Sequence, residues 1–360
     1  MPIESISISR FRNLHPAELV LSPGLNLITG ANAAGKTSLL EALFVLARGR
    51  SFRTTQLDKL IQSGHSDFQL VVRLVTPEGR HLPVGIQRSQ GRFECRINGR
   101  ATKRLSDLAT LFPVQWVGGN LHTLVEDGPA YRRQFLDWGL FHVKPDYIVL
   151  WKRFNKLLKQ RNAALRSGAG LREVQAWNPE LAEAGELLHH YRKDYLERLL
   201  EVFTAINPQF PTLTEPVSIS YRKGWQAAAT YSEVLNESFG KDQESKFTRA
   251  GPQRAELGFS VAGRPASEQL SRGQQKVFIT ALQVAQASLL QRQTGKTSLF
   301  LLDDLGSELD TENQHAVLQL LSRIEAQVIV SAIDEPSITG LAPDSVKRFH
   351  VKHGVVTEVV

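Results

Sequence analysis

Residues 30–37 carry the clearest chemical signal in the sequence, because Gly30 is followed five residues later by Gly35, and a lysine and a threonine come directly after Gly35. An apolar segment at 25–29 precedes this stretch and a helical pattern follows it, which is the strand–loop–helix context of a phosphate-binding loop. Glycines let backbone N–H groups turn toward a phosphate, and the helix N-terminus adds its positive end. A chance glycine-rich turn, the alternative, does not explain that context. The residues expected to bind a nucleoside triphosphate are Gly30, Ala31, Asn32, Ala33, Ala34, Gly35, Lys36 and Thr37.

Lys36 is expected to reach the β- and γ-phosphates as a catalytic residue, and the Thr37 hydroxyl to ligate Mg²⁺. Asp303 and Asp304 follow an apolar run at 299–302, which is typical of a strand buried on both faces. Two carboxylates there are costly unless they meet a cation or water. We expect Asp303 to hold Mg²⁺ through water and Asp304 to orient or deprotonate the attacking water. The alternative is a polar strand end that caps the next element.

A third element, Leu-Ser-Arg-Gly-Gln-Gln-Lys at 270–276, precedes that strand and opens a helical stretch. A serine cap, a glycine and a free helix N-terminus together suit a γ-phosphate. The alternative is a serine-capped helix with no ligand. The residues expected to contact the nucleotide from this segment are Ser271, Arg272, Gly273 and Gln274.

The elements that must position these residues are α-helices and β-strands in alternation. Period-two patterns separated by turn residues predict strands at 5–11, 25–29, 68–75, 82–87 and 93–97. Helical patterns occupy 36–47, 129–141, 147–166 and 180–206. Further strands are expected at 298–302, 327–331 and in a hairpin over 349–359.

This order predicts an α/β fold, an ATPase head that carries antiparallel strands and an inserted helical lobe. The head is expected to be discontinuous and to comprise 1–116 and 250–360. The inserted, mainly helical lobe is expected at 117–249. The mixed segment 212–240 gives no clear pattern.

Composition and charge limit the class of protein. The chain has 360 residues, a formal net charge of +7 and one cysteine, Cys95, so no intrachain disulfide is possible. The N-terminus lacks a signal-peptide pattern and no apolar run suits a membrane helix. We expect a cytosolic protein without a membrane role, and the basic excess permits a polyanionic partner.

One predicted helix has a basic face. Between 150 and 172 the sequence contains no acidic residue. Lys152, Lys156, Lys159 and Arg166 fall on one side of this helix and are the candidate DNA contacts. Trp151, Phe154, Leu158 and Leu165 fall on the other side, which is expected to be buried. The alternative is a solvated lysine face. Arg132 and Arg133 are a second candidate pair, with bracing of the lobe as their alternative role.

Several motifs together resemble the bacterial RecF family of ABC-type ATPases, which is related to the heads of SMC proteins. The segment 270–274 resembles the ABC signature, and Gln115 occupies the place of a catalytic Q-loop glutamine. The other segments that carry the resemblance are 10–14, 30–37, 128–138, 157–165, 251–252, 303–304 and the D-loop-like 307–310.

The resemblance implies an ATP- and Mg²⁺-dependent homodimer in which the signature of one copy reaches the nucleotide of the other. It implies binding of double-stranded DNA and of single-strand/duplex junctions at gaps, with slow, DNA-stimulated ATP hydrolysis. It further implies partnership with RecR and RecO and the loading of RecA in recombinational repair and replication-fork maintenance.

The sequence departs from related patterns at a few positions. Arg272, Asp304 and Ser331 stand where transporter ATPases carry glycine, glutamate and histidine, which argues against a transporter subunit and against fast turnover. Gly118-Gly119 replaces Pro-Glu of the family, and Asn313 replaces a basic residue. An ABC-type ATPase subunit of another machine, with no DNA role, is the remaining alternative.

Overall fold

The structure is a computed structural model that describes residues 1–89, 91–102, 104–119, 121–213, 215–335 and 346–359. The chain divides into two compact units. The first unit comprises Met1–Leu121, Asn207–Thr212 and Lys276–Val360, and the second comprises His122–Ile206 and Leu213–Gln275. The predicted α/β class, with both antiparallel and parallel strands, is confirmed.

The first sheet of the first unit is antiparallel, with strand order β2-β1-β4-β5-β6-β7. Its strands alternate buried and more exposed residues, so one face is buried; β4 shows this alternation along its whole length. Its strands are β1 (Ile3–Ser9), β2 (Ala17–Val20), β4 (Asp67–Val75), β5 (His81–Ser89), β6 (Arg92–Ile97) and β7 (Arg100–Thr102).

The second sheet of the first unit has strand order β15-β14-β3-β13-β12-β8 and is parallel except for its β14–β15 hairpin. Strands β12 and β13 are buried along their whole length, as central parallel strands are. Its strands are β3 (Leu25–Thr29), β8 (Val114–Val117), β12 (Leu299–Leu302), β13 (Gln327–Ala332), β14 (Val346–Lys352) and β15 (Val355–Val359).

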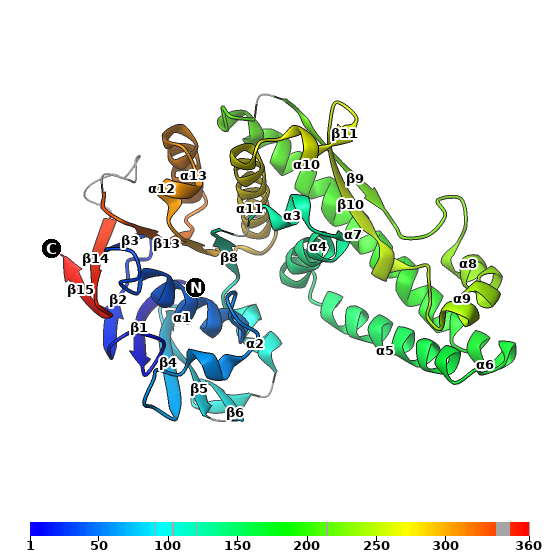
Figure 1. Ribbon diagram of the computed structural model, residues 1–360, viewed down its shortest axis with the longest axis horizontal. Coiled ribbons are helices and arrows are strands. Elements are labelled where there is room, and N and C mark those ends of the chain that lie inside the picture. Colours follow the sequence, from blue (N-terminus) through cyan, green and yellow to red (C-terminus); the bar gives the residue numbers. More distant parts are fainter. Residues whose placement is uncertain (90, 103, 120, 214, 336–345, 360) are drawn as a thin grey trace. The chain divides into compact units, whose positions relative to one another are not determined.

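Helix α1 (Lys36–Arg48) packs against strands of both sheets and completes the core between them (Figure 1). Nearly all of its residues are buried, because helix faces on both sides meet a sheet. The other helices of the unit are α2 (Leu105–Leu111), α12 (Leu305–Glu308), α13 (Thr311–Arg323) and the part of α11 (Arg272–Thr294) that starts at Lys276.

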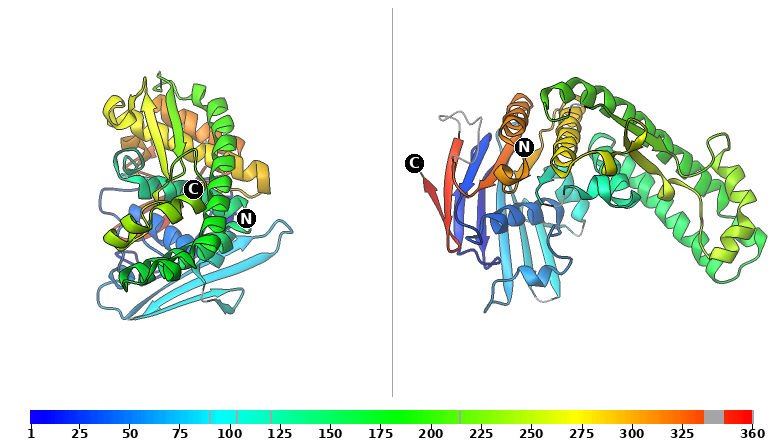
Figure 2. Two further views of the ribbon diagram at one scale, coloured as in Figure 1. Left: turned by 90° about the vertical axis from the view of Figure 1, so that its right-hand side faces the viewer. Right: turned by 45° about the horizontal axis from the view of Figure 1, so that its top comes forward.

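The second unit is mainly helical, and its long helices α5 and α7 pack against each other (Figure 2). It also contains a three-stranded antiparallel sheet, β11-β10-β9, which the sequence patterns did not reveal. The helices are α3 (Thr123–Glu126), α4 (Pro129–Val143), α5 (Tyr147–Arg166), α6 (Leu171–Gln175), α7 (Asn178–Ile206), α8 (Tyr231–Glu237), α9 (Phe239–Ser245) and α10 (Ala266–Gln269). The strands are β9 (Val217–Arg222), β10 (Glu256–Val261) and β11 (Arg264–Pro265).

The unit boundaries differ from the predicted limits at 116/117 and 249/250. Residues 250–275 group with the second unit because β10 pairs with β9 from Glu256↔Arg222 to Val261↔Val217. The segment Asn207–Thr212 groups with the first unit. The pairing of β9 with β10 joins strands that lie far apart in the sequence, so no local sequence pattern could predict it.

Arg161 and Asp242 form a fully buried ion pair inside the second unit. Both side chains are 0% exposed, and Arg161 Nη1 lies 2.8 Å from Asp242 Oδ2. Arg161 also donates to the side-chain oxygens of Asn178 and Thr248 and to the backbone carbonyl of Leu235. This network joins α5, α7, α8 and α9, so the basic residue at the centre of the acid-free segment is a core residue.

We predict that Asp242→Asn lowers the free energy of unfolding by about 3–5 kcal/mol, since it leaves the Arg161 guanidinium buried without its counter-charge. Urea denaturation measures this change. Glu183→Gln is the matched control, because it removes the exposed partner of Arg153 in the same unit and should cost less than about 1 kcal/mol. Equal, small effects of both substitutions would contradict the prediction.

Candidate nucleotide site

The loop between β3 and α1 has the backbone conformation of a phosphate cradle. Gly30 and Gly35 adopt φ angles of +151° and +125°, which side chains rarely allow. A Cβ at Gly30 would also lie 2.3 Å from the backbone oxygen of Val351. The two glycines of the motif are therefore required by geometry, and α1 begins at Lys36, directly behind the loop.

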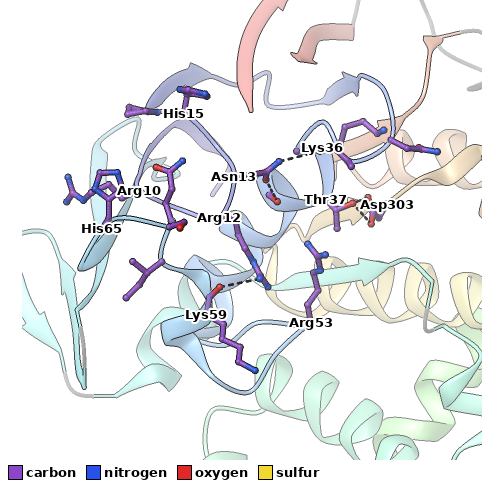
Figure 3. Close-up of a pocket in the computed structure, with 18 of the residues that line it drawn as sticks. Arg10, Arg12, Asn13, His15, Lys36, Thr37, Arg53, Lys59, His65 and Asp303 are labelled. Atoms are coloured by element: carbon purple, nitrogen blue, oxygen red, sulfur yellow. Dashed lines mark hydrogen bonds between the residues drawn. The ribbon is translucent and has the colours of Figure 1, made fainter. Parts of the chain in front are cut away.

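Lys36 lies across this loop and is only 7% exposed. Its Nζ donates to the backbone oxygens of Gly30 at 2.7 Å and Ala31 at 3.1 Å. The ammonium group is thus held at the mouth of the loop (Figure 3). A phosphate oxygen that approaches the loop would meet this charge together with the α1 N-terminus.

The predicted acidic pair lies at the same edge of the parallel sheet, at the carboxyl end of β12. Thr37 Oγ1 is 3.1 Å from both Asp303 Oδ1 and Asp303 Oδ2. Ser331, at the end of β13, donates from its Oγ to Asp303 Oδ1 at 2.7 Å and accepts the Asp304 N–H at 2.9 Å. The structure therefore brings Thr37, Asp303 and Asp304 together and adds Ser331, which the sequence patterns did not assign.

Burial raises the pKa of Asp303 above its ordinary value, and the neighbouring Asp304 raises it further. Hydrogen bonds from Ser331 and Thr37 and the charge of Lys36 act in the opposite direction but do not outweigh burial. A buried carboxylate beside a threonine hydroxyl suits a hard divalent cation. The described residues contain no cluster of three or more His, Cys, Asp or Glu, so such a cation would also need oxygens from the ligand or water.

Asp304 lines the pocket, and its backbone is left-handed at φ +51°. It precedes α12, and its Oδ2 accepts a hydrogen bond from Ser307 Oγ at 2.9 Å. The carboxylate is therefore restrained beside the loop, in a position consistent with the predicted role of orienting water.

The pocket is larger than the phosphate loop alone, with a volume of about 1240 Å³, and much of its rim is basic (Figure 3). These rim residues come from segments 10–15, 53–59 and 65 of the first unit and were not predicted as site residues. The basic side chains are Arg10, Arg12, His15, Arg53, Lys59 and His65. A pocket with this charge suits a polyanion. The signal available in the sequence was the cluster Arg10, Arg12 and His15, whereas Arg53, Lys59 and His65 stand apart and give no such signal.

Gln115, the predicted Q-loop glutamine, does not line this pocket. It lies within β8, is buried, and donates from Nε2 to Gln286 Oε1 at 3.1 Å. The following Gly118 departs from the family pattern for a local reason. A Cβ there would lie 2.6 Å from the Trp116 ring, which stacks on Phe52.

The signature-like segment forms a capped helix start in the second unit. The Ser271 N–H donates to Gln274 Oε1 at 2.9 Å, and the Gln274 N–H donates to Ser271 Oγ at 3.2 Å, which is a reciprocal cap. Ser271, Arg272 and Gly273 are exposed. The predicted cap is therefore present, and its side chains are accessible from solvent.

The basic face of α5 is exposed at Lys152, Lys156, Lys159 and Arg166, and none of them has an acidic partner within 4.0 Å among the described residues. Arg153 instead contacts Glu180 and Glu183. On the other face Phe154 and Leu165 are buried, but Trp151 is 37% exposed, so its predicted burial is wrong. Trp151 lies near the start of the helix, where packing against the rest of the unit is incomplete.

Arg132 and Arg133 have internal partners. Arg132 Nε lies 2.7 Å from Glu256 Oε1, and its Nη1 donates to three backbone oxygens. Arg133 donates to the Ala255 backbone oxygen. Both therefore brace α4 against the β10 segment.

Comparison with known proteins gives one consistent family. The family described as the RecF/RecN/SMC N terminal domain matches residues 2–357. A protein of Aliivibrio fischeri (strain MJ11) named DNA replication and repair protein RecF is 37% identical over 99% of this chain and 100% of its own length. A protein of the same name from Nitrosococcus oceani is 40% identical over the whole of both chains.

Solved structures agree on the fold. A structure described as the recombination mediator protein RecF-ATP in the RecFOR pathway superposes with a TM-score of 0.86 at 24% identity, over 100% of this chain and 98% of that one. An SMC head bound to a winged-helix domain of ScpA gives a TM-score of 0.61 at 15% identity, over 100% and 97% of the two chains. No described helix combines the length and apolarity needed to cross a bilayer.

We predict that Asp303→Asn raises the Tm near pH 7, because it removes a carboxylate that the fold buries at a cost. The pKa of Asp303 is higher in the folded state than in the unfolded state, so its ionised carboxyl destabilises the fold. This cost is present only at pH values above the ordinary pKa of the group. The gain should therefore disappear as the pH falls below about 4, where both states are protonated. Thermal melts from about pH 3 to about pH 7, without nucleotide or metal, measure this dependence.

Asp67 is the control with the opposite sign, since the Arg10 guanidinium lowers the pKa of its carboxyl. Asp67→Asn should lower the Tm near pH 7 and have no effect at low pH. A Tm that falls near pH 7 for Asp303→Asn would contradict the prediction for this site.

Proposed function

The chain belongs to the RecF family, and from this premise we propose that it is an ATP-dependent DNA-binding clamp in recombinational repair and replication-fork maintenance. The observation that carries the proposal is that the loop Gly30–Lys36 and the contact between Thr37 and Asp303 lie together at one edge of the parallel sheet. Relatives named as DNA replication and repair proteins over their whole length support the cellular role.

ATP is the proposed nucleotide, with its phosphates against the residue 30–37 loop and its charge balanced by Lys36. When bound, Mg²⁺ supplies neutralisation of the phosphate oxygens. The Thr37 hydroxyl would ligate it directly, and Asp303 would hold it through water. Asp304 would orient the attacking water and accept its proton, while Ser331 holds the backbone of Asp304 and the carboxylate of Asp303 in place.

Dimerisation is proposed to follow from ATP binding. The capped helix start at Ser271–Gln274 would approach the γ-phosphate that a second copy holds, because the positive end of the helix and the Ser271 hydroxyl suit an anion. The site is then complete only in the dimer, so ATP acts as a switch. The structure described for RecF-ATP belongs to a relative with the same fold and supports ATP as the ligand.

Double-stranded DNA and single-strand/duplex junctions are the proposed substrates of the clamp. The exposed basic face of α5, which we name the α5 stripe and define as Lys152, Lys156, Lys159 and Arg166, is the proposed contact. Its lysines have no acidic partner among the described residues, so their charge is available to phosphates. Gln115, which donates to Gln286, is the proposed Q-loop glutamine of the catalytic site.

RecR and RecO are the proposed partners, and the loading of RecA at gaps is the proposed outcome. The support is the name of the RecFOR pathway given to a relative of the same fold. Hydrolysis is proposed to be slow for two reasons. Asp304 has a shorter side chain than the glutamate that fast ABC ATPases carry at this position, and Ser331 stands where they carry a histidine.

We predict that Ser271→Ala raises the dimer dissociation constant about tenfold in the presence of a non-hydrolysable ATP analogue, while affinity for the nucleotide at monomer concentrations stays within about twofold. Sedimentation velocity and fluorescence titration measure the two quantities. Ser267→Ala, an exposed serine of α10, is the matched control and should change neither. Loss of nucleotide affinity in the Ser271 variant would show a structural role instead.

We predict that Lys36→Arg weakens both nucleotide binding and ATP-driven dimerisation. The longer planar guanidinium cannot occupy the position of Lys36 Nζ between the Gly30 and Ala31 oxygens. Sedimentation of this variant as an unchanged ATP-dependent dimer would count against the proposed nucleotide site.

Binding to duplex DNA tests the α5 stripe. Replacing Lys152, Lys156 and Lys159 with glutamine should reduce the slope of log affinity against log salt by about 0.9 for each phosphate that these lysines neutralise. The matched control replaces Arg198, Lys241 and Lys246, which are exposed elsewhere on the second unit, and it removes the same net charge. Equal slopes for both triple variants would remove the α5 stripe from the interface. Absence of DNA binding with and without ATP would favour an ABC-type ATPase of another machine.

A further inference from the structure

Glu41 is a charged residue in the middle of the most buried helix of the first unit. It lies on α1 between Leu40 and Ala42, and its side chain is 0% exposed. A carboxylate in this position is costly unless cations and hydrogen-bond donors surround it. The structure provides three such groups, each from a segment that borders the nucleotide pocket.

Arg12 binds Glu41 with both arms of its guanidinium. Its Nε lies 2.9 Å from Glu41 Oε2, and its Nη2 lies 2.9 Å from Glu41 Oε1. The third nitrogen, Nη1, donates to the backbone oxygen of Lys59 at 3.3 Å. The carboxylate therefore fixes the plane of a guanidinium that lines the pocket (Figure 3).

The segment after α1 is linked to Glu41 in two ways. The Ser51 hydroxyl donates to Glu41 Oε1 and accepts the backbone N–H groups of Arg53 and Thr54. Arg53 Nη1 lies 3.7 Å from Glu41 Oε2. The Arg53 side chain is 48% exposed and extends into the pocket on the side of Thr37 (Figure 3).

One carboxylate thus stands between two arginines that line the same pocket. Without its charge the two guanidinium groups would repel each other, and both long side chains would gain freedom to turn toward solvent. Held by Glu41, they leave a net positive charge at the pocket rim in a defined geometry.

We propose that Glu41 is a positioning residue for nucleotide binding: it holds Arg12 and Arg53 at the pocket rim so that their charges meet the nucleotide phosphates. This inference rests on the proposed nucleotide function. Glu41 itself is fully buried and is not among the residues that line the pocket, so it acts through the two arginines and does not touch the ligand.

The main competing role is a purely structural ion pair. The 51–53 segment has an anchor that is independent of Glu41, because Phe52 stacks on Trp116 with ring centroids 3.7 Å apart and meets Phe44 edge-on. Loss of the Glu41 charge should therefore disorder the two arginine side chains and leave the path of the backbone in place.

The test is a double-mutant cycle on the full-length protein, read by equilibrium binding of a fluorescent non-hydrolysable ATP analogue. Glu41→Gln keeps the size of the side chain and is expected to weaken binding at least tenfold. Arg53→Gln is expected to weaken it by a similar factor. If Glu41 acts through Arg53, the affinity of the double variant for the analogue is less than twofold below that of whichever single variant binds more weakly. Multiplication of the two losses would overturn the proposal, as would wild-type affinity in a folded Glu41→Gln protein.

Asp242→Asn is the control for destabilisation, because it breaks a buried ion pair of the second unit and should lower the Tm without changing nucleotide affinity. Should Glu41→Gln fail to fold, Ser51→Ala carries the same test, since it removes only the hydroxyl that links Glu41 to the Arg53 backbone. A loss of affinity that vanishes in the Arg53→Gln background supports the proposal, and an unchanged affinity overturns it.

The affinity of the wild-type protein for the analogue distinguishes a failure of the Glu41 proposal from a failure of the proposed nucleotide function. Wild-type binding of the analogue together with unaffected Glu41 and Ser51 variants would reject the role of Glu41 and leave the proposed nucleotide function intact. Failure of the wild-type protein to bind the analogue would reject both.

Discussion

Burial of a carboxylate beside a phosphate loop is the constraint on which the first unit depends. The order β3-β13-β12 brings the carboxyl ends of three parallel strands to one edge, and each end contributes a different group: the loop before Lys36, Ser331 and Asp303. Asp303 keeps a raised pKa there because its hydrogen bonds do not fully offset desolvation. A site that tolerates such a cost in the folded protein suits the cation that we propose, whose binding would relieve the cost. The strand order, more than any single motif, therefore brings the groups of the candidate site together.

Whether a basic side chain can act on an anion depends on the acidic groups that it contacts, and the net charge of +7 does not show this. Arg161 is fully buried against Asp242 and stabilises the second unit from within. Arg12 is paired with Glu41 but still lines the pocket, so it has both a structural contact and an exposed edge. The lysines of the α5 stripe are solvated and lack acidic partners among the described residues. These three arrangements predict three different responses to substitution, in stability, in nucleotide affinity and in salt dependence.

Local patterns predicted the elements whose signal is contained within one segment. The loop at 30–37, the α5 helix at 147–166 and the aspartates after β12 all lie where the sequence indicated, because turn, helix and buried-strand preferences act over a few residues. Pairing across long separations was not predictable. The β9–β10 ladder joins 217–222 to 256–261, so it moved the boundary of the second unit. The hydrogen bond between Gln115 and Gln286 was not predictable for a similar reason, since the two residues are far apart in sequence. Arg53 and Glu41 could not be linked to the pocket without the fold.

The groups around Asp304 are consistent with a switch that hydrolyses slowly. Its backbone is left-handed, its amide is held by Ser331, and its Oδ2 accepts a hydrogen bond from Ser307, so its short side chain has little freedom to follow a moving water. An enzyme selected for turnover would gain from a longer or freer base. The proposed clamp would have the opposite requirement, because its ATP-bound dimer would have to persist on DNA. We infer that the restraint on Asp304 and the basic rim held by Glu41 act together: tight binding of the triphosphate combined with weak activation of water would lengthen the lifetime of the proposed ATP-bound dimer.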